Sequence, residues 1–121
     1  MNTNQTVNTT NSLAIIAEMN RNECNVYLRD HITLLTNCIN QREAQYAVNI
    51  ERLVQVDAQT ERATNARSSI DPSLERLIHA ANLEVSSYTE QARNLVVANQ
   101  QLRAQVESAQ RSIANLAQRI N

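Results

Sequence analysis

The sequence predicts an all-α protein: a long two-helix antiparallel coiled-coil hairpin with a short N-terminal helix, which completes a helical bundle with partner chains. Three observations lead to this fold class. The 121 residues include no Gly, so the tight turns of a sheet or a phosphate loop lack their usual residue. They include no Phe and no Trp, which makes a wide core hard to fill. An apolar heptad repeat also continues to the C-terminus after Pro72.

The N-terminal part predicts a polar tail followed by a short helix. Residues 1–11 are rich in Asn and Thr and can bury little surface, so we expect them to be disordered in the isolated chain. A single helical domain then covers residues 12–121. Asn11 or Ser12 can cap a first helix over about 12–20. The polar stretch 20–22 is expected to break it, and a second helical pattern covers about 23–67.

A sharp boundary is predicted near residues 68–71. Asp71 is a good N-cap, and Pro72 suits the first position of a helix, where the missing N–H costs nothing. The third helix is therefore expected over about 72–120. Its a positions recur every seven residues from Ile78 to Ile120, and its d positions recur from Leu74 to Leu116. All of them are apolar except Asn99, and the spacing does not slip, which is typical of a coiled coil. In the helix over 23–67 the a positions start at Ile32 and the d positions at Leu28.

Folding the chain at residues 70 and 71 lets the two long helices be paired as an antiparallel hairpin. This register places Ile39 opposite Leu102 and places Arg42 opposite Asn99, so that two polar positions meet. The C-terminus then lies opposite Asn20, and residues 1–19 extend past the hairpin. The predicted core residues are Leu35, Ile39, Arg42, Leu53, Val85, Tyr88, Leu95, Asn99, Leu102, Val106, Ile113 and Leu116.

A parallel, self-associating coiled coil is the alternative topology. β-branched residues at a and Leu at d suit two parallel strands, and one Asn at a sets their register. The flanking e and g positions, however, hold mostly Gln, Ala, Thr and Val, which offer no clear ion pairs between chains. The hairpin is therefore favoured, and self-association remains open.

Apolar residues outside the a and d positions predict contact with other proteins. A two-helix hairpin would leave them in water, so further helices from partner chains are expected to cover them. The predicted protein-binding residues are Leu13, Ile15, Ile16, Met19, Leu77, Val96 and Val97. Similar apolar residues of the second helix are Leu34, Val48, Ile50 and Val54.

No residue pattern indicates catalysis, a metal or a cofactor. Cys24, His31 and Cys38 are each seven residues apart. Seven residues of helix span about 10.5 Å, whereas zinc–ligand bonds are only about 2 Å long. A net charge of −1 and scattered Arg residues argue against nucleic acid, and no stretch is apolar enough for a membrane helix. Two cysteines and the lack of a secretory signal suggest an intracellular, reducing compartment.

The start MNTNQTVNTTNSLAIIAEM, the small size and the helical body together resemble the small capsid-associated protein of baculoviruses. That family takes part in nucleocapsid assembly and nuclear actin accumulation. The resemblance implies helical structural proteins as partners in a large hetero-complex, located in the virion and the host nucleus. We therefore expect a non-enzymatic assembly subunit, a minor component of a viral nucleocapsid. The alternative is a soluble coiled-coil adaptor, for instance in actin control or vesicle tethering.

Overall fold

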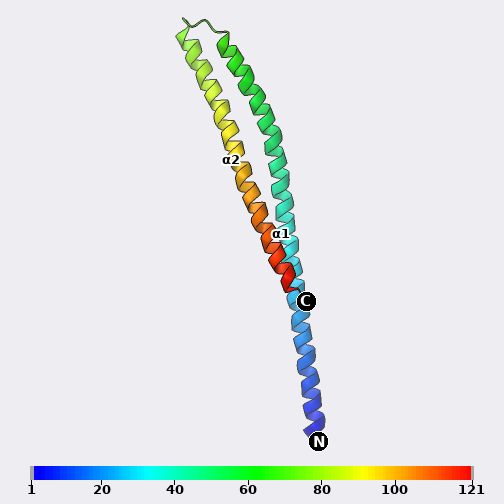
Figure 1. The fold of residues 1–121 in the computed structure, drawn as a ribbon. Coiled ribbons are helices and arrows are strands. Elements are labelled where there is room, and N and C mark those ends of the chain that lie inside the picture. Colours follow the sequence, from blue (N-terminus) through cyan, green and yellow to red (C-terminus); the bar gives the residue numbers. More distant parts are fainter. Residues whose placement is uncertain (1, 121) are drawn as a thin grey trace. The chain divides into compact units, whose positions relative to one another are not determined.

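A computed structural model describes the backbone of residues 2–120 and the side chains of residues 12–120. Two helices make up this part of the chain, α1 (Asn2–Ser68) and α2 (Glu75–Arg119), and residues 2–120 contain no strand (Figure 1). The predicted all-α helical hairpin is confirmed. The chain divides into two compact units, one of Met1–Ile39 with Glu107–Asn121 and one of Asn40–Val106.

Helix α1 is continuous, which corrects the predicted tail, the cap at residues 11–12 and the break at residues 20–22. Asn and Thr are weak helix formers and Arg is a good one, and none of them interrupts a helix as Pro or Gly does. Pro72 is the first such residue in the chain. Lengthening an existing helix also adds one hydrogen bond per residue without a new nucleation cost. The side chains of residues 2–11 lie outside the described part of the structure.

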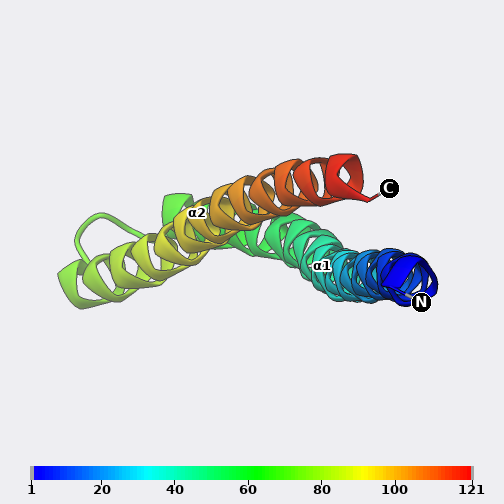
Figure 2. The same ribbon diagram turned by 90° about the horizontal axis from the view of Figure 1, so that it is seen from below.

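In the second unit, a short connection joins the end of α1 to the start of α2 (Figures 1 and 2). The Asp71 carbonyl accepts a 2.9 Å hydrogen bond from the Leu74 N–H, which closes a turn with Pro72 at its second position. The Asp71 carboxylate accepts bonds from the Ser73 N–H (3.0 Å) and hydroxyl (2.9 Å). Asp71 therefore stabilises the turn, and α2 begins at Glu75 rather than at residue 72.

The two helices of the second unit pair one heptad away from the predicted register. Asn49 Nδ2 donates a 2.9 Å hydrogen bond to Asn99 Oδ1, so these two residues face each other across the seam. The predicted Arg42–Asn99 layer is wrong: Arg42 Nε instead donates to Gln105 Oε1 at 2.8 Å. The reason is that a shift by a whole heptad keeps every a residue opposite a d residue, while this register also pairs the two Asn side chains.

The seam of the second unit contains the predicted core positions. Val56 and Ala63 are buried, with 3% and 8% of their surface exposed, and the polar residues Asn49 and Asn99 are also buried, with 8% and 6% exposed. The predicted core residues that are half-buried here are Arg42, Leu53, Val85, Tyr88, Leu95, Leu102 and Val106. Half-burial is expected of a seam only two helices wide, because each side chain is covered from one direction.

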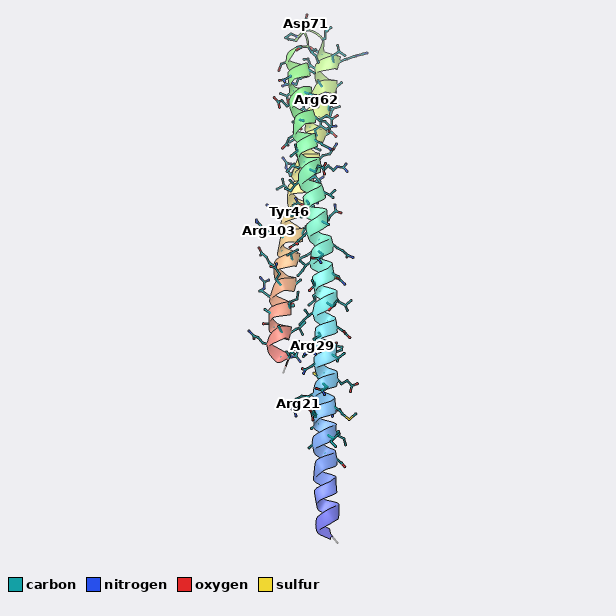
Figure 3. All side chains as sticks on the ribbon, turned by 90° about the vertical axis from the view of Figure 1, so that its right-hand side faces the viewer. Arg21, Arg29, Tyr46, Arg62, Asp71 and Arg103 are labelled. Carbon is teal, nitrogen blue, oxygen red and sulfur yellow. The ribbon has the colours of Figure 1, made fainter. Side chains whose placement is uncertain are left out.

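In the first unit, the last turns of α2 lie beside α1, and α1 continues beyond them. Arg29 lies level with the end of α2, and Arg21 lies past it (Figures 1 and 3). The prediction that the C-terminus reaches Asn20 is therefore wrong. Leu28, only 2% exposed, is the last buried apolar residue of the seam towards the N-terminus, because the a and d positions beyond it hold Asn25, Arg21 and Glu18. The other predicted core residues in this unit, Leu35, Ile39, Ile113 and Leu116, are buried or half-buried.

Candidate protein-binding surface

The N-terminal part of α1 carries an exposed apolar face. Leu13, Ile15, Ile16 and Met19 are each between 51% and 62% exposed. At about 100° per residue, these four side chains fall on the side of α1 opposite its a and d positions. At those positions the same stretch has Ala14, Glu18 and Arg21 instead. The apolar side of α1 therefore changes direction beyond the end of α2, which leaves these residues available to another molecule.

The predicted binding residues of the second unit do not share one face. Leu77, Val96 and Val97 are 55%, 44% and 45% exposed, but they occupy heptad positions g, e and f of α2. Val96 alone belongs to a defined surface feature. Together with Ile50, it borders a shallow groove over the seam, whose other lining residues are Tyr46, Leu53, Asn99, Gln100 and Arg103. Tyr46 and Arg103 lie close to the same level on the two helices (Figure 3).

A buried network of amides lies beneath this groove. Gln45 Nε2 donates to Asn49 Oδ1 at 2.8 Å, Asn49 Nδ2 donates to Asn99 Oδ1 at 2.9 Å, and Asn99 Nδ2 reaches the Tyr46 carbonyl at 3.4 Å. Asn49 and Asn99 are only 8% and 6% exposed. Each buried amide thus has a partner, and the network fixes the pairing of the helices rather than offering chemistry to a ligand.

Sequence reasoning missed a further exposed face on α1. Val26 (54% exposed) and Tyr27 (67%) were not singled out from the sequence, whereas Leu34 (64%) was among the apolar residues expected to contact partner chains. The seven-residue spacing of Cys24, His31 and Cys38 was the feature of the sequence that could have indicated this face. Tyr27 and Leu34 lie between them, and the Tyr27 and His31 rings meet edge to face with centroids 6.2 Å apart. Cys24, Tyr27, His31, Leu34 and Cys38 follow a second heptad phase on α1, and Val26 lies outside it.

The described side chains offer no metal cluster: residues 12–120 contain no group of three or more His, Cys, Asp or Glu placed to hold an ion. Cys24 and Cys38 are free thiols, one exposed and one half-buried. Within the described residues, neither helix has an apolar stretch that is long enough to cross a membrane.

The fold and its surface define a class: a helical hairpin whose α1 exposes apolar faces outside the seam. Comparisons with known proteins add no narrower assignment, because no family model, no curated protein and no solved structure matches this chain.

Proposed function

We propose that this chain is a non-enzymatic assembly subunit, which binds other protein chains through exposed faces of its helices. The observation that carries the proposal is the N-terminal part of α1. It holds Leu13, Ile15, Ile16 and Met19 in water, past the end of α2, where no other helix of the first unit covers them. Contiguous apolar surface of this kind marks interaction sites, and a helix with an apolar side fits a groove on a partner.

The nucleocapsid setting follows from the resemblance to the small capsid-associated protein of baculoviruses. In that setting the partners are helical structural proteins of the particle, and the sites of action are the virion and the host nucleus. The internal design of the chain supports a permanent subunit: a seam that is half-buried at most positions gains from further helices packed on it. A soluble adaptor would instead bind one partner transiently and in less than stoichiometric amounts.

The proposal is tested by co-purification of the tagged full-length chain from the cells that make it, with quantitative mass spectrometry. An assembly subunit is recovered at a fixed ratio to its partners, also in purified particles. The double variant Ile15→Glu, Met19→Glu should lose at least one partner, because both charges would lie in the docked face. Deleting residues 1–19 should have the same effect.

Deleting residues 1–11 is the matched control, since it removes the polar segment and keeps all four apolar side chains. This shorter chain should recover every partner. Full recovery by the Ile15→Glu, Met19→Glu variant, with unchanged helicity by circular dichroism, would contradict the proposal. Recovery of one partner in clearly substoichiometric amounts would favour the adaptor.

A further inference from the structure

Helix α1 of the first unit carries a second stripe, which we define as Leu13, Ala17, Asn20, Cys24, Tyr27, His31, Leu34 and Cys38. Successive members are three or four residues apart, the same alternation as in the a/d seam. Leu13, Tyr27 and Leu34 are 62%, 67% and 64% exposed, so α2 does not cover them. A surface with this periodicity fits another α-helix that coils around α1.

The second stripe is continuous with the established seam. Around the helix it borders the d positions, where Leu28 is buried and Leu35 is half-buried against α2. Between residues 24 and 39, apolar and aromatic side chains thus cover about half of the circumference of α1 or more. A helix of this kind belongs between two neighbours in a bundle, and α2 supplies one of them.

The second stripe of another copy is a matching surface for this stripe, because it has the same spacing and the same exposed apolar residues. The outer positions of α2 from Glu75 to Arg119 interleave single apolar residues with charged and amide side chains. On the side next to the second stripe, α2 of the first unit presents polar residues, namely Ser108, Ser112, Asn115 and Arg119. A stripe that pairs with its own copy about a twofold axis is the ordinary arrangement of a homodimer.

The charged residues beside the second stripe favour one orientation of the second copy. Glu23 and Asp30 flank the second stripe on the side away from α2. Arg119 is the last residue of α2 and flanks the stripe from the side of α2, and the end of α2 lies level with Arg29 (Figure 3). In a parallel pair, the acidic flank of one α1 faces the α2 side of the other, so Asp30 of one copy meets Arg119 of the other. In an antiparallel pair, the two acidic flanks would meet and repel. Among residues 12–120, neither Asp30 nor Arg119 has an ion-pair partner.

We propose that a second copy of this chain occupies the second stripe, parallel and in register, and that this pair is the unit in which the proposed assembly subunit works. Identical residues then face each other along the stripe. Asn20 meets Asn20 of the second copy, an amide pair of the kind that the chain already uses between Asn49 and Asn99. Cys24 meets Cys24, and Cys38 meets Cys38.

The native cysteines test the orientation in the purified full-length chain. Mild oxidation with copper phenanthroline should give disulfide-linked dimers, and peptide mapping should find Cys24 joined to Cys24 and Cys38 joined to Cys38. The single variants Cys24→Ser and Cys38→Ser should each still cross-link through the remaining thiol. If only Cys24–Cys38 links form between chains, and both single variants lose them, the pair is antiparallel and the proposal is overturned.

Sedimentation equilibrium tests the surface itself. Leu34→Glu should raise the dimer dissociation constant at least about tenfold, because two carboxylates would enter the apolar stripe. Val26→Glu is the matched control: Val26 is also exposed on α1, but it lies outside the second stripe, and the constant should stay within about twofold. Both variants change exposed side chains, so circular dichroism should show unchanged helicity.

Exchanging the charges of Asp30 and Arg119 distinguishes this specific pairing from nonspecific hydrophobic association. Asp30→Arg and Arg119→Asp should each weaken the dimer, and the double variant should regain most of the loss. A chain that stays monomeric at every concentration overturns the proposal. If that chain still loses a partner through Ile15→Glu, Met19→Glu, the proposed function stands while the self-pairing fails.

Discussion

Replacing Asn99 by Leu tests the amide layer that sets the register of the second unit. The substitution keeps the branched shape and the number of heavy atoms of the side chain and removes both hydrogen bonds of Asn99. Asn49 Nδ2, which donates to Asn99 Oδ1 at 2.9 Å, is then left in a site that is only 8% exposed. The 3.4 Å contact to the Tyr46 carbonyl matters less, because that carbonyl is inside a helix and the contact is long.

The magnitude follows from the orphaned amide. A buried polar group that loses its partner costs about 1–3 kcal/mol of unfolding free energy, and the same range applies to Asn49→Leu. Replacing both residues by Leu removes the orphan and adds apolar contact, so the double variant should be as stable as the natural chain or more stable. The two substitutions should therefore couple by about 2 kcal/mol or more.

Urea unfolding followed by circular dichroism at 222 nm measures all four members of this cycle. The chain should be studied with Cys24 and Cys38 replaced by Ser, so that oxidation does not interfere, and at one fixed protein concentration. Additive effects, with a coupling below about 0.5 kcal/mol, would mean that the two amides do not rely on each other. The amide layer would then not explain the register.

Two further predictions concern the same unit. The Asn49–Asn99 pairing places Val56 opposite Ala92, one heptad away. In the background without native thiols, cysteines at Val56 and Ala92 should therefore form an intrachain disulfide, while cysteines at Val56 and Val85 should not. The reverse result, on a non-reducing gel with peptide mapping, would support the register predicted from the sequence. A further prediction concerns Asp71, whose carboxyl has a pKa below its ordinary value of 3.8 because it accepts hydrogen bonds from the Ser73 N–H and hydroxyl. The contribution of this carboxylate to stability is therefore complete above pH 3.8 and is lost as the pH falls through the lower pKa of the folded state. Asp71→Asn should therefore reduce this acid dependence of the unfolding midpoint, and an unchanged pH profile would show that the turn does not depend on the charge.

Much of the fold could be predicted from the sequence, because helix formation and heptad phase are local properties. The absence of Gly, the isolated Asp71–Pro72 and the apolar repeat were enough to place two long helices and their connection. The burial of Val56, Ala63 and Leu28 at d positions follows from the same spacing. The exposure of Leu13, Ile15, Ile16 and Met19 also agrees with their positions away from the seam.

The start of α1 could not be predicted, because no residue before Pro72 forces a helix to begin or to end. The second stripe was hidden for a different reason. Tyr27 and Leu34 already lie within the predicted helix over 23–67, but only the unbroken α1 places Leu13, Ala17 and Asn20 in one row with them.

The sequence by itself determined that the chain forms helices, which of their sides form the seam between them and where the chain reverses. The tertiary structure decided how far one helix slides along the other. A heptad repeat leaves that question open, because every shift by seven residues again brings a residues opposite d residues. The choice depends on the few positions that break the repeat. Asn49 and Asn99 satisfy each other in one register, and in the other Asn49 would face the methyl group of Ala92.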